Sequence, residues 1–142
     1  MPRFQLVTLS GIKFDGDVYE VIVPTLDGEI GILPGHMPLV SVATDGVIYV
    51  RHKAADRDDM MEFFAISGGV VKVEDEVLQI LVDEADAADE ISETEAKAAY
   101  DRAKKLKAEA KDQVSLDKAQ SLIDRSATRL KVAEIKRRHH RR

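Results

Sequence analysis

The hydrophobic positions in the first 84 residues form short runs that are rich in Val, Ile and aromatic residues. Most of these runs are bounded by Gly, Pro or Asp, which is typical of strands that fold back on one another. In the first run neither alternating face is cleanly apolar, so its strand signal is weak. Together the runs predict an antiparallel β-sandwich or a flattened barrel. They are Phe4–Leu9, Val18–Val23, Val47–Val50, Met60–Ile66, Val70–Val73 and Val77–Val82.

Turn residues are densest between positions 25 and 51, which read TLDGEIGILPGHMPLVSVATDGVIYVR. Because Gly tolerates positive φ, Asp-Gly pairs between apolar runs favour tight hairpin turns. We therefore expect hairpin turns at Asp45-Gly46 and at Asp15-Gly16.

From residue 92 onwards the pattern changes to that of helices, with Ala and Lys abundant and no Gly or Pro after Gly69. Ser92 and Glu95 have the spacing of a capping box, in which the Ser hydroxyl accepts a hydrogen bond from the amide three residues later. A break at 112–116 contains Ser115, a good cap for a second helix. The sequence thus predicts a sandwich over residues 1–86 and an antiparallel helical hairpin over residues 87–142.

The predicted contact between the two helices consists largely of alanines, among them Ala96, Ala103 and Ala119. A buried CH₂ group contributes only about 0.8 kcal/mol, so an alanine seam holds weakly. Such a hairpin should pack without being permanently closed. The alternative is an ordinary helical appendage.

Charge is divided unevenly along the chain. Residues 115–142 carry nine basic and three acidic side chains, a net charge of +6, so the first 114 residues carry −11 of the total of −5. A basic end on an acidic body suggests an acidic protein partner. The alternative is that the cations offset the dipole at a helix C-terminus. No aromatic residues are interleaved with the basic tail, so we do not expect nucleic acid to bind.

Catalytic chemistry is not indicated by the residues. The chain has no cysteine and only four histidines, and no pairing of a nucleophile with a base is visible. No apolar run approaches the ~20 residues needed to cross a bilayer, and the N-terminus has no signal-peptide core. We therefore expect a non-enzymatic protein of a bacterial cytoplasm that meets membranes only through partners.

Four segments together resemble one family, the ε subunit of bacterial F-type ATP synthase. They keep their order and spacing across nearly the whole chain and lie in both of its differently patterned halves. They are GEIGILPGHMPLV from Gly28, ISGGVVKV from Ile66, which resembles an apolar strand entering a Ser-Gly-Gly turn, VLQILVDEADAADEI from Val77 and RLKVAEIK from Arg129.

The resemblance implies a sandwich of about ten strands followed by the helical hairpin. It implies a rotor subunit of the central stalk, bound to the γ subunit and the c-ring, peripheral on the cytoplasmic side of the bacterial inner membrane. It also implies that the hairpin extends along γ and inhibits ATP hydrolysis when its basic end meets an acidic segment of the β subunit within the α and β catalytic head. Lys136, Arg137 and Arg138 are the expected contacts with the β subunit.

Glu29, Gly31 and His36 match the loop with which the family faces the c-ring. Gly31 would shape this loop so that its polar side chains project from the surface. The alternative for His36 is that it simply caps a turn.

Some members of the family bind ATP in the hairpin. Here Ile91, Arg102, Arg125 and Arg129 match parts of that pattern, but Ser92 replaces an acid and Glu95 stands where the pattern has a cation. A carboxylate repels phosphate, so we expect weak or no ATP binding and no other cofactor. A nucleotide-sensing ligand-binding module remains the alternative function.

Asp56, Asp58 and Asp59 could in principle bind a cation. Arg57 lies among them and no glycine bends the segment, so a solvated hairpin tip without metal is the preferred interpretation.

Overall fold

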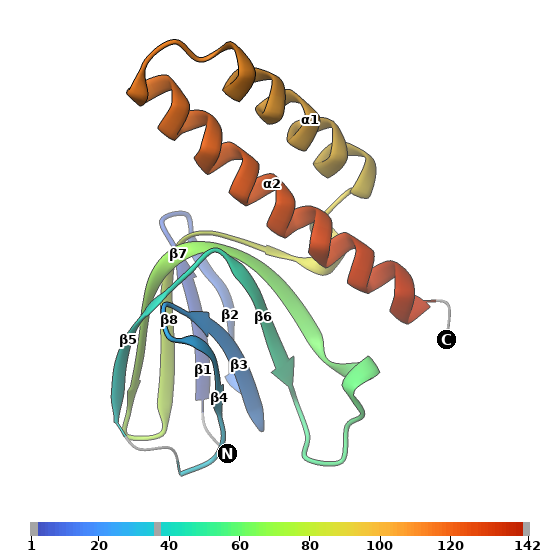
Figure 1. Ribbon diagram of the computed structural model, residues 1–142. Coiled ribbons are helices and arrows are strands. Elements are labelled where there is room, and N and C mark those ends of the chain that lie inside the picture. Colours follow the sequence, from blue (N-terminus) through green and yellow to red (C-terminus); the bar gives the residue numbers. More distant parts are fainter. Residues whose placement is uncertain (1–2, 36–37, 141–142) are drawn as a thin grey trace. The chain divides into compact units, whose positions relative to one another are not determined.

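The computed structural model describes residues 3–35 and 38–140, and its contacts divide the chain into one unit that ends at Ala87 and another that begins at Ala88. The sequence placed this boundary one residue earlier. The first unit contains eight strands: β1 (Arg3–Thr8), β2 (Gly11–Asp17), β3 (Glu20–Thr25), β4 (Gly28–Ile32), β5 (Leu39–Ala43), β6 (Gly46–Arg51), β7 (Glu62–Glu74) and β8 (Val77–Ala87), with a short 3-10 helix η1 (Asp58–Met60) before β7 (Figure 1).

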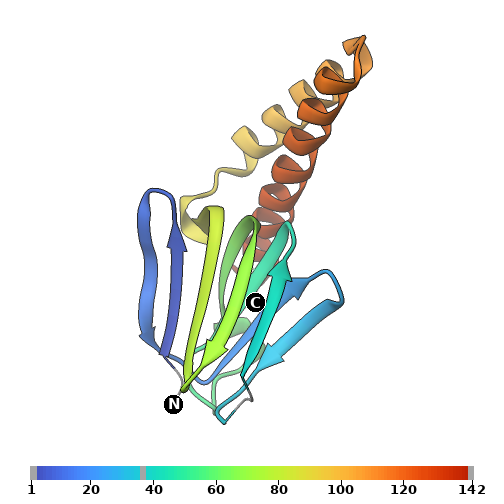
Figure 2. The same ribbon diagram turned by 90° about the vertical axis from the view of Figure 1, so that its left-hand side faces the viewer.

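Two long strands join the layers of a β-sandwich. The second half of β7 pairs with β5, whereas its first half pairs with β6. One layer therefore runs β2-β1-β8-β7-β5, an order that can be followed in Figure 2, and the other contains β4, β3, β6 and the remaining part of β7 with β8. Counting the halves of β7 and β8 separately gives ten strand segments, which accounts for the expected number of about ten.

The bend in β7 lies at Ser67–Gly69, where the sequence suggested a turn. The register with β8 continues unchanged across it, so this is one strand and not two. Gly69 has a φ of +145°, and a Cβ there would stand 2.0 Å from the carbonyl oxygen of Leu81. Only glycine permits the backbones to approach this closely.

Two predicted hairpin turns are wrong. Asp15 and Gly16 lie inside β2, and the turn between β1 and β2 falls at Leu9-Ser10. Asp45 precedes β6, but β5 and β6 both pair with β3 and β7 and not with each other, so this segment is a corner between layers. An Asp-Gly pair indicates a bend in the chain but does not determine which strands pair.

The sandwich core consists of the inward residues of both layers. The weakly patterned first strand is confirmed by Phe4 and Leu6, both fully buried. Besides them the core contains Val18, Val21, Val23, Ile32, Ala43, Ile48, Val50, Phe64, Ile66, Val71, Val73, Leu78, Ile80, Val82 and Ala85.

The second unit is a helical hairpin made of α1 (Glu93–Glu109) and α2 (Gln113–His140), preceded by the 3-10 helix η2 (Ala88–Glu90) (Figure 1). The Ser92 hydroxyl accepts a hydrogen bond from the amide of Glu95 at 3.3 Å, as predicted. The predicted cap at Ser115 is wrong: Ser115 already lies inside α2, and its amide donates to the Asp112 carboxylate at 2.7 Å. Asp112 was the better candidate because a carboxylate accepts strongly from first-turn amides.

Candidate functional site

The residues matched to the c-ring loop do not share one loop. Glu29 and Gly31 lie within β4, opposite Pro24 and Ile22 of β3, and the connection to β5 begins only after Ile32. The prediction of one Gly-rich loop is therefore wrong for these two residues, because pairing with β3 extends the strand past the glycines. His36 lies outside the described residues.

Glu29 belongs to the outward face of the β4-β3-β6 layer. Ile22 stands opposite both Gly31 and Tyr49, so these residues share that face with Glu29. Burial raises the pKa of the Tyr49 hydroxyl, and the negative charge of Glu29 raises it further. A Cβ on Gly31 would meet a Glu20 carboxylate oxygen at 3.6 Å, an ordinary contact. Gly31 is thus not required by the backbone, and it leaves the face open between Glu20 and Glu29.

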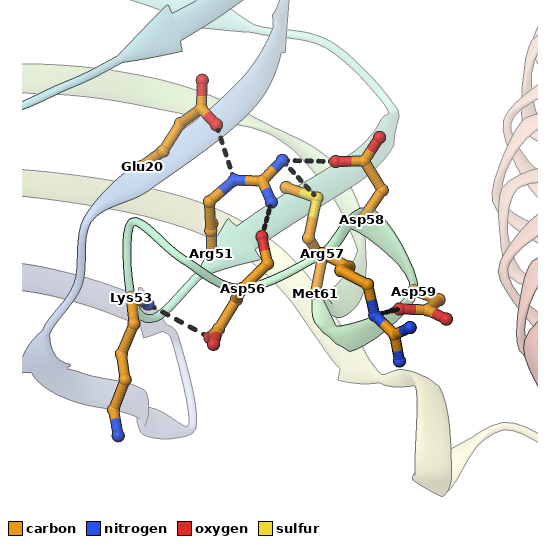
Figure 3. A network of polar contacts seen from close by, with 8 residues as sticks. All are labelled: Glu20, Arg51, Lys53, Asp56, Arg57, Asp58, Asp59 and Met61. Carbon is orange, nitrogen blue, oxygen red and sulfur yellow. Dashed lines mark hydrogen bonds and ion pairs between the residues drawn. The ribbon is translucent and has the colours of Figure 1, made fainter.

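Arg51, which the sequence did not single out, organises the adjacent polar cluster (Figure 3). Its guanidinium group lies 3.1 Å from Glu20 and 2.5 Å from Asp58, and it donates to the backbone carbonyl of Asp56. Hydrogen bonds to Asp58 and then to Glu20 raise its pKa. Because Arg51 contacts both Glu20 of β3 and the loop after β6, it ties that loop to β3. Its side chain is only 15% exposed.

The three carboxylates of that loop do not converge on a cation. Asp58 pairs with Arg51, Asp59 pairs with Arg57 at 3.4 Å, and Asp56 accepts from the amide of Lys53 at 3.2 Å. Within residues 3–35 and 38–140 no group of carboxylates and histidines has metal-binding geometry. Arg51 and Arg57 pair with two of these acids, and a backbone amide binds the third. The signal available in the sequence was the arginine before the loop and the arginine among the acids.

The hairpin residues matched to the ATP pattern are spread along both helices. Ile91 is buried just before α1, Arg102 is exposed on α1, and Arg125 and Arg129 lie on α2. Asp89 pairs with Lys136, so Ile91 lies near the C-terminal end of α2. Arg125 precedes Lys136 on α2 by about 16 Å, at a rise of about 1.5 Å per residue. A shallow hollow beside Arg125 is lined by α2 residues alone.

The basic residues near the end of α2 are held by acids of the same unit. Lys136 lies 3.4 Å from Asp89 of η2, and Arg137 donates to Glu93 of α1 at 2.9 Å. Arg138 is exposed. The described residues contain no helix that is long and apolar enough to cross a membrane.

Residues 2–88 match the family model described as the β-sandwich domain of the ATP synthase Delta/Epsilon chain. The ATP synthase epsilon chain of Rippkaea orientalis is 35% identical over 134 residues, covering 92% of this chain and 95% of that one. The epsilon chain of Halalkalibacterium halodurans is 34% identical, with 90% and 93% covered.

Two solved structures share the fold. One is in the mitochondrial ATP synthase of Euglena gracilis, solved with OSCP, F1 and the c-ring; its TM-score is 0.75 at 21% identity, covering 88% of this chain and 76% of that one. The other is in the central stalk and c-ring of the Tetrahymena thermophila mitochondrial ATP synthase, with a TM-score of 0.56 at 15% identity and coverage of 91% and 93%. With the family model spanning the sandwich and the bacterial relatives spanning both units, the chain belongs to the ATP synthase epsilon chain family.

Proposed function

We propose that this protein is a non-catalytic rotor subunit of the central stalk of a bacterial F-type ATP synthase, and that its hairpin inhibits ATP hydrolysis. The observation that carries the proposal is the similarity to bacterial epsilon chains over both units, since the relatives cover 92% and 90% of the chain. The solved neighbours come from assemblies that contain F1, a central stalk or a c-ring. The protein would reach the cytoplasmic side of the inner membrane through these partners, in a motor driven by protons or sodium ions.

The surface proposed for docking to the γ subunit is an apolar row on the β5-β7-β8 face. Val42, Val70 and Leu81 stand opposite one another on adjacent strands and are 49%, 42% and 45% exposed. A contiguous exposed apolar row on an otherwise charged protein is characteristic of a protein interface. The c-ring contact is assigned to the region of Glu29, Gly31 and His36.

Co-assembly tests the docking surface. Val70→Glu places a charge on an exposed position, so the sandwich should fold but should no longer co-purify with γ. Met60→Glu is the matched control, because Met60 is also an exposed apolar residue, at 55%, and lies outside the row. Retention of the Val70→Glu variant in the complex at the wild-type level would contradict this surface.

The inhibitory role is assigned to the basic end of α2, where Lys136, Arg137 and Arg138 would meet an acidic segment of the β subunit. The alanine seam supports movement of the hairpin, since buried Ala96, Ala103 and Ala119 contribute little apolar area. A two-state element needs states that differ by only a few kcal/mol. Truncation after Ala88 should leave a sandwich that still assembles and a complex that hydrolyses ATP faster. An unchanged hydrolysis rate would contradict an inhibitory role of the hairpin.

A narrower test neutralises Arg137 and Arg138 with glutamine. Inhibition should weaken and lose much of its dependence on salt, because exposed charges are screened within about 10 Å at 0.1 M ionic strength. Neutralising Lys105 and Lys111, exposed lysines at the other end of the hairpin, is the control. Inhibition that is insensitive both to salt and to the Arg137 and Arg138 changes would exclude an electrostatic contact.

ATP binding to the hairpin is proposed to be weak or absent. Glu95 stands in the first turn of α1, where its carboxylate would repel a phosphate. Titration of the isolated protein with ATP, followed by NMR, tests this. A micromolar dissociation constant would overturn it and would favour a nucleotide-sensing role.

A further inference from the structure

Two ion pairs join the end of α2 to the segment that begins the hairpin. The Lys136 ammonium nitrogen lies 3.4 Å from a carboxylate oxygen of Asp89, and an Arg137 guanidinium nitrogen lies 2.9 Å from one of Glu93. Asp89 belongs to η2 and Glu93 is the first residue of α1. The two acids are four positions apart, and they hold two adjacent cations.

We propose that Asp89 and Glu93, which we name the acidic clasp, act as an internal substitute for the acidic partner of α2. Lys136 and Arg137 are two of the three residues assigned above to the β-subunit contact, so this inference rests on the proposed function. In the closed hairpin the clasp occupies these cations. The acidic segment of the partner and the clasp therefore compete for the same two cations. The inhibitory end of α2 is released only when the ion pairs of the clasp break.

The exposure of the four side chains sets how strongly the clasp holds. Asp89 is 93% exposed, Arg137 50%, Glu93 37% and Lys136 30%. Solvent screens pairs of this kind, and measured exposed pairs change an equilibrium by about 1.4- to 5-fold each. Two such pairs bias the hairpin towards closure by roughly 2- to 25-fold. That is enough to shift a population and too little to lock it, as an exchangeable contact requires.

The simplest competing explanation is that Glu93 only stabilises the start of α1. A carboxylate in the first turn interacts favourably with the helix dipole wherever it points. Glu95 provides the matched control, because it lies in the same first turn and no cross-helix ion pair of Glu95 is present among the described residues. Glu93→Gln and Glu95→Gln remove the same charge from the same turn, but only Glu93→Gln removes a bond to α2.

The free full-length protein gives the first test, and the absence of native cysteine allows specific labelling. Spin labels at Ala98→Cys and Lys131→Cys, both exposed and on opposite helices, report whether α1 and α2 lie together. Glu93→Gln should raise the ratio of open to closed hairpin about 1.4- to 5-fold, and Asp89→Asn should do the same. Glu95→Gln should leave the ratio unchanged. Equal ratios for Glu93→Gln and Glu95→Gln would overturn the clasp.

Exchanging the charges of one pair tests whether contact, and not charge alone, matters. Arg137→Glu should open the hairpin, and combining it with Glu93→Arg should restore closure. In 1 M salt, where the screening length is about 3 Å, the differences between the variants should largely disappear. A double exchange that opens the hairpin as much as Arg137→Glu alone would refute the pairing.

ATP hydrolysis by the reconstituted complex separates this inference from the proposed function. If both hold, Glu93→Gln strengthens inhibition, and so does Asp89→Asn. If the clasp exists but the hairpin does not inhibit hydrolysis, Glu93→Gln changes the distances between the spin labels and leaves the hydrolysis rate unchanged. If the hairpin inhibits hydrolysis without a clasp, neutralising Arg137 relieves inhibition. Glu93→Gln then alters neither the distances between the spin labels nor the hydrolysis rate.

Discussion

Replacing Gly69 with alanine should destabilise the sandwich more than any other Gly→Ala change. Gly69 lies at the bend where β7 passes from one layer to the other. A Cβ at this position would stand 2.0 Å from the carbonyl oxygen of Leu81 and 2.9 Å from its carbonyl carbon. These are backbone atoms of the paired strand, so no side-chain rotation can relieve the overlap.

The expected cost follows from two contributions. A φ of +145° lies in a region that alanine avoids, at about 1–3 kcal/mol. Separating β7 from β8 enough to admit the methyl group weakens neighbouring ladder hydrogen bonds, each contributing about 0.5–1.5 kcal/mol. With two such bonds weakened, the sum is about 2–6 kcal/mol. This is a large part of the roughly 5–15 kcal/mol that stabilises an ordinary domain.

Urea unfolding of the full-length protein, followed through the NMR amide signals of β7 and β8, measures this loss separately from the hairpin. Gly16→Ala is the control: Gly16 also lies in a strand, and its Cβ would meet the Phe14 ring at an unstrained 3.7 Å. That variant should differ from wild type by less than about 1 kcal/mol. If Gly69→Ala is as stable as Gly16→Ala, the close approach of β7 to β8 is refuted.

Three further predictions concern turns and helix caps. The turn between β7 and β8 places Glu76 at a φ of 62°; Glu76→Gly should stabilise the sandwich by about 1 kcal/mol, measured as a higher urea midpoint. Ser92→Ala should cost the hairpin about 1 kcal/mol of unfolding free energy, measured from the hydrogen exchange of the α1 amides, because the Glu95 amide loses its acceptor. Hydrogen bonds from Ser115 lower the pKa of Asp112, so its stabilisation is present above the unfolded pKa of about 3.9 and is lost as the pH falls through the lower folded value. Asp112→Asn should flatten that acid limb of a stability–pH curve followed by helical circular dichroism.

Local features were predictable wherever one residue and its neighbours decide the outcome. The Ser92 cap needs only a hydroxyl and the first turn of a helix, and both were visible in the sequence. The core positions Phe4 and Leu6 were harder, because each alternating face of the run containing them mixes apolar and polar residues. Their burial depends on pairing with β8, which lies more than seventy residues away in the chain.

Features that depend on non-local pairing escaped prediction. Asp15-Gly16 has turn chemistry, yet pairing with β1 keeps it inside β2, and Glu29 is drawn into β4 by β3 in the same way. The role of Arg51 depends on Glu20 and Asp58 meeting it from different segments. No local pattern identifies an arginine that will be enclosed in this way.

The two units differ in what holds them together, and this difference suits the proposed function, in which the sandwich is anchored and the hairpin moves. The sandwich buries large side chains such as Phe64, Ile48 and Leu78 between layers joined by β7 and β8, so no part of it can separate without exposing the core. The hairpin unit buries mostly alanines, with Ile91 and Val132 as its larger buried apolar residues. Its exposed ion pairs each contribute about 1 kcal/mol or less. Under the proposed function, partners would displace α2 from α1 against these small contributions. The same partners could not open the sandwich, so the docking surfaces proposed on its outward faces would stay fixed.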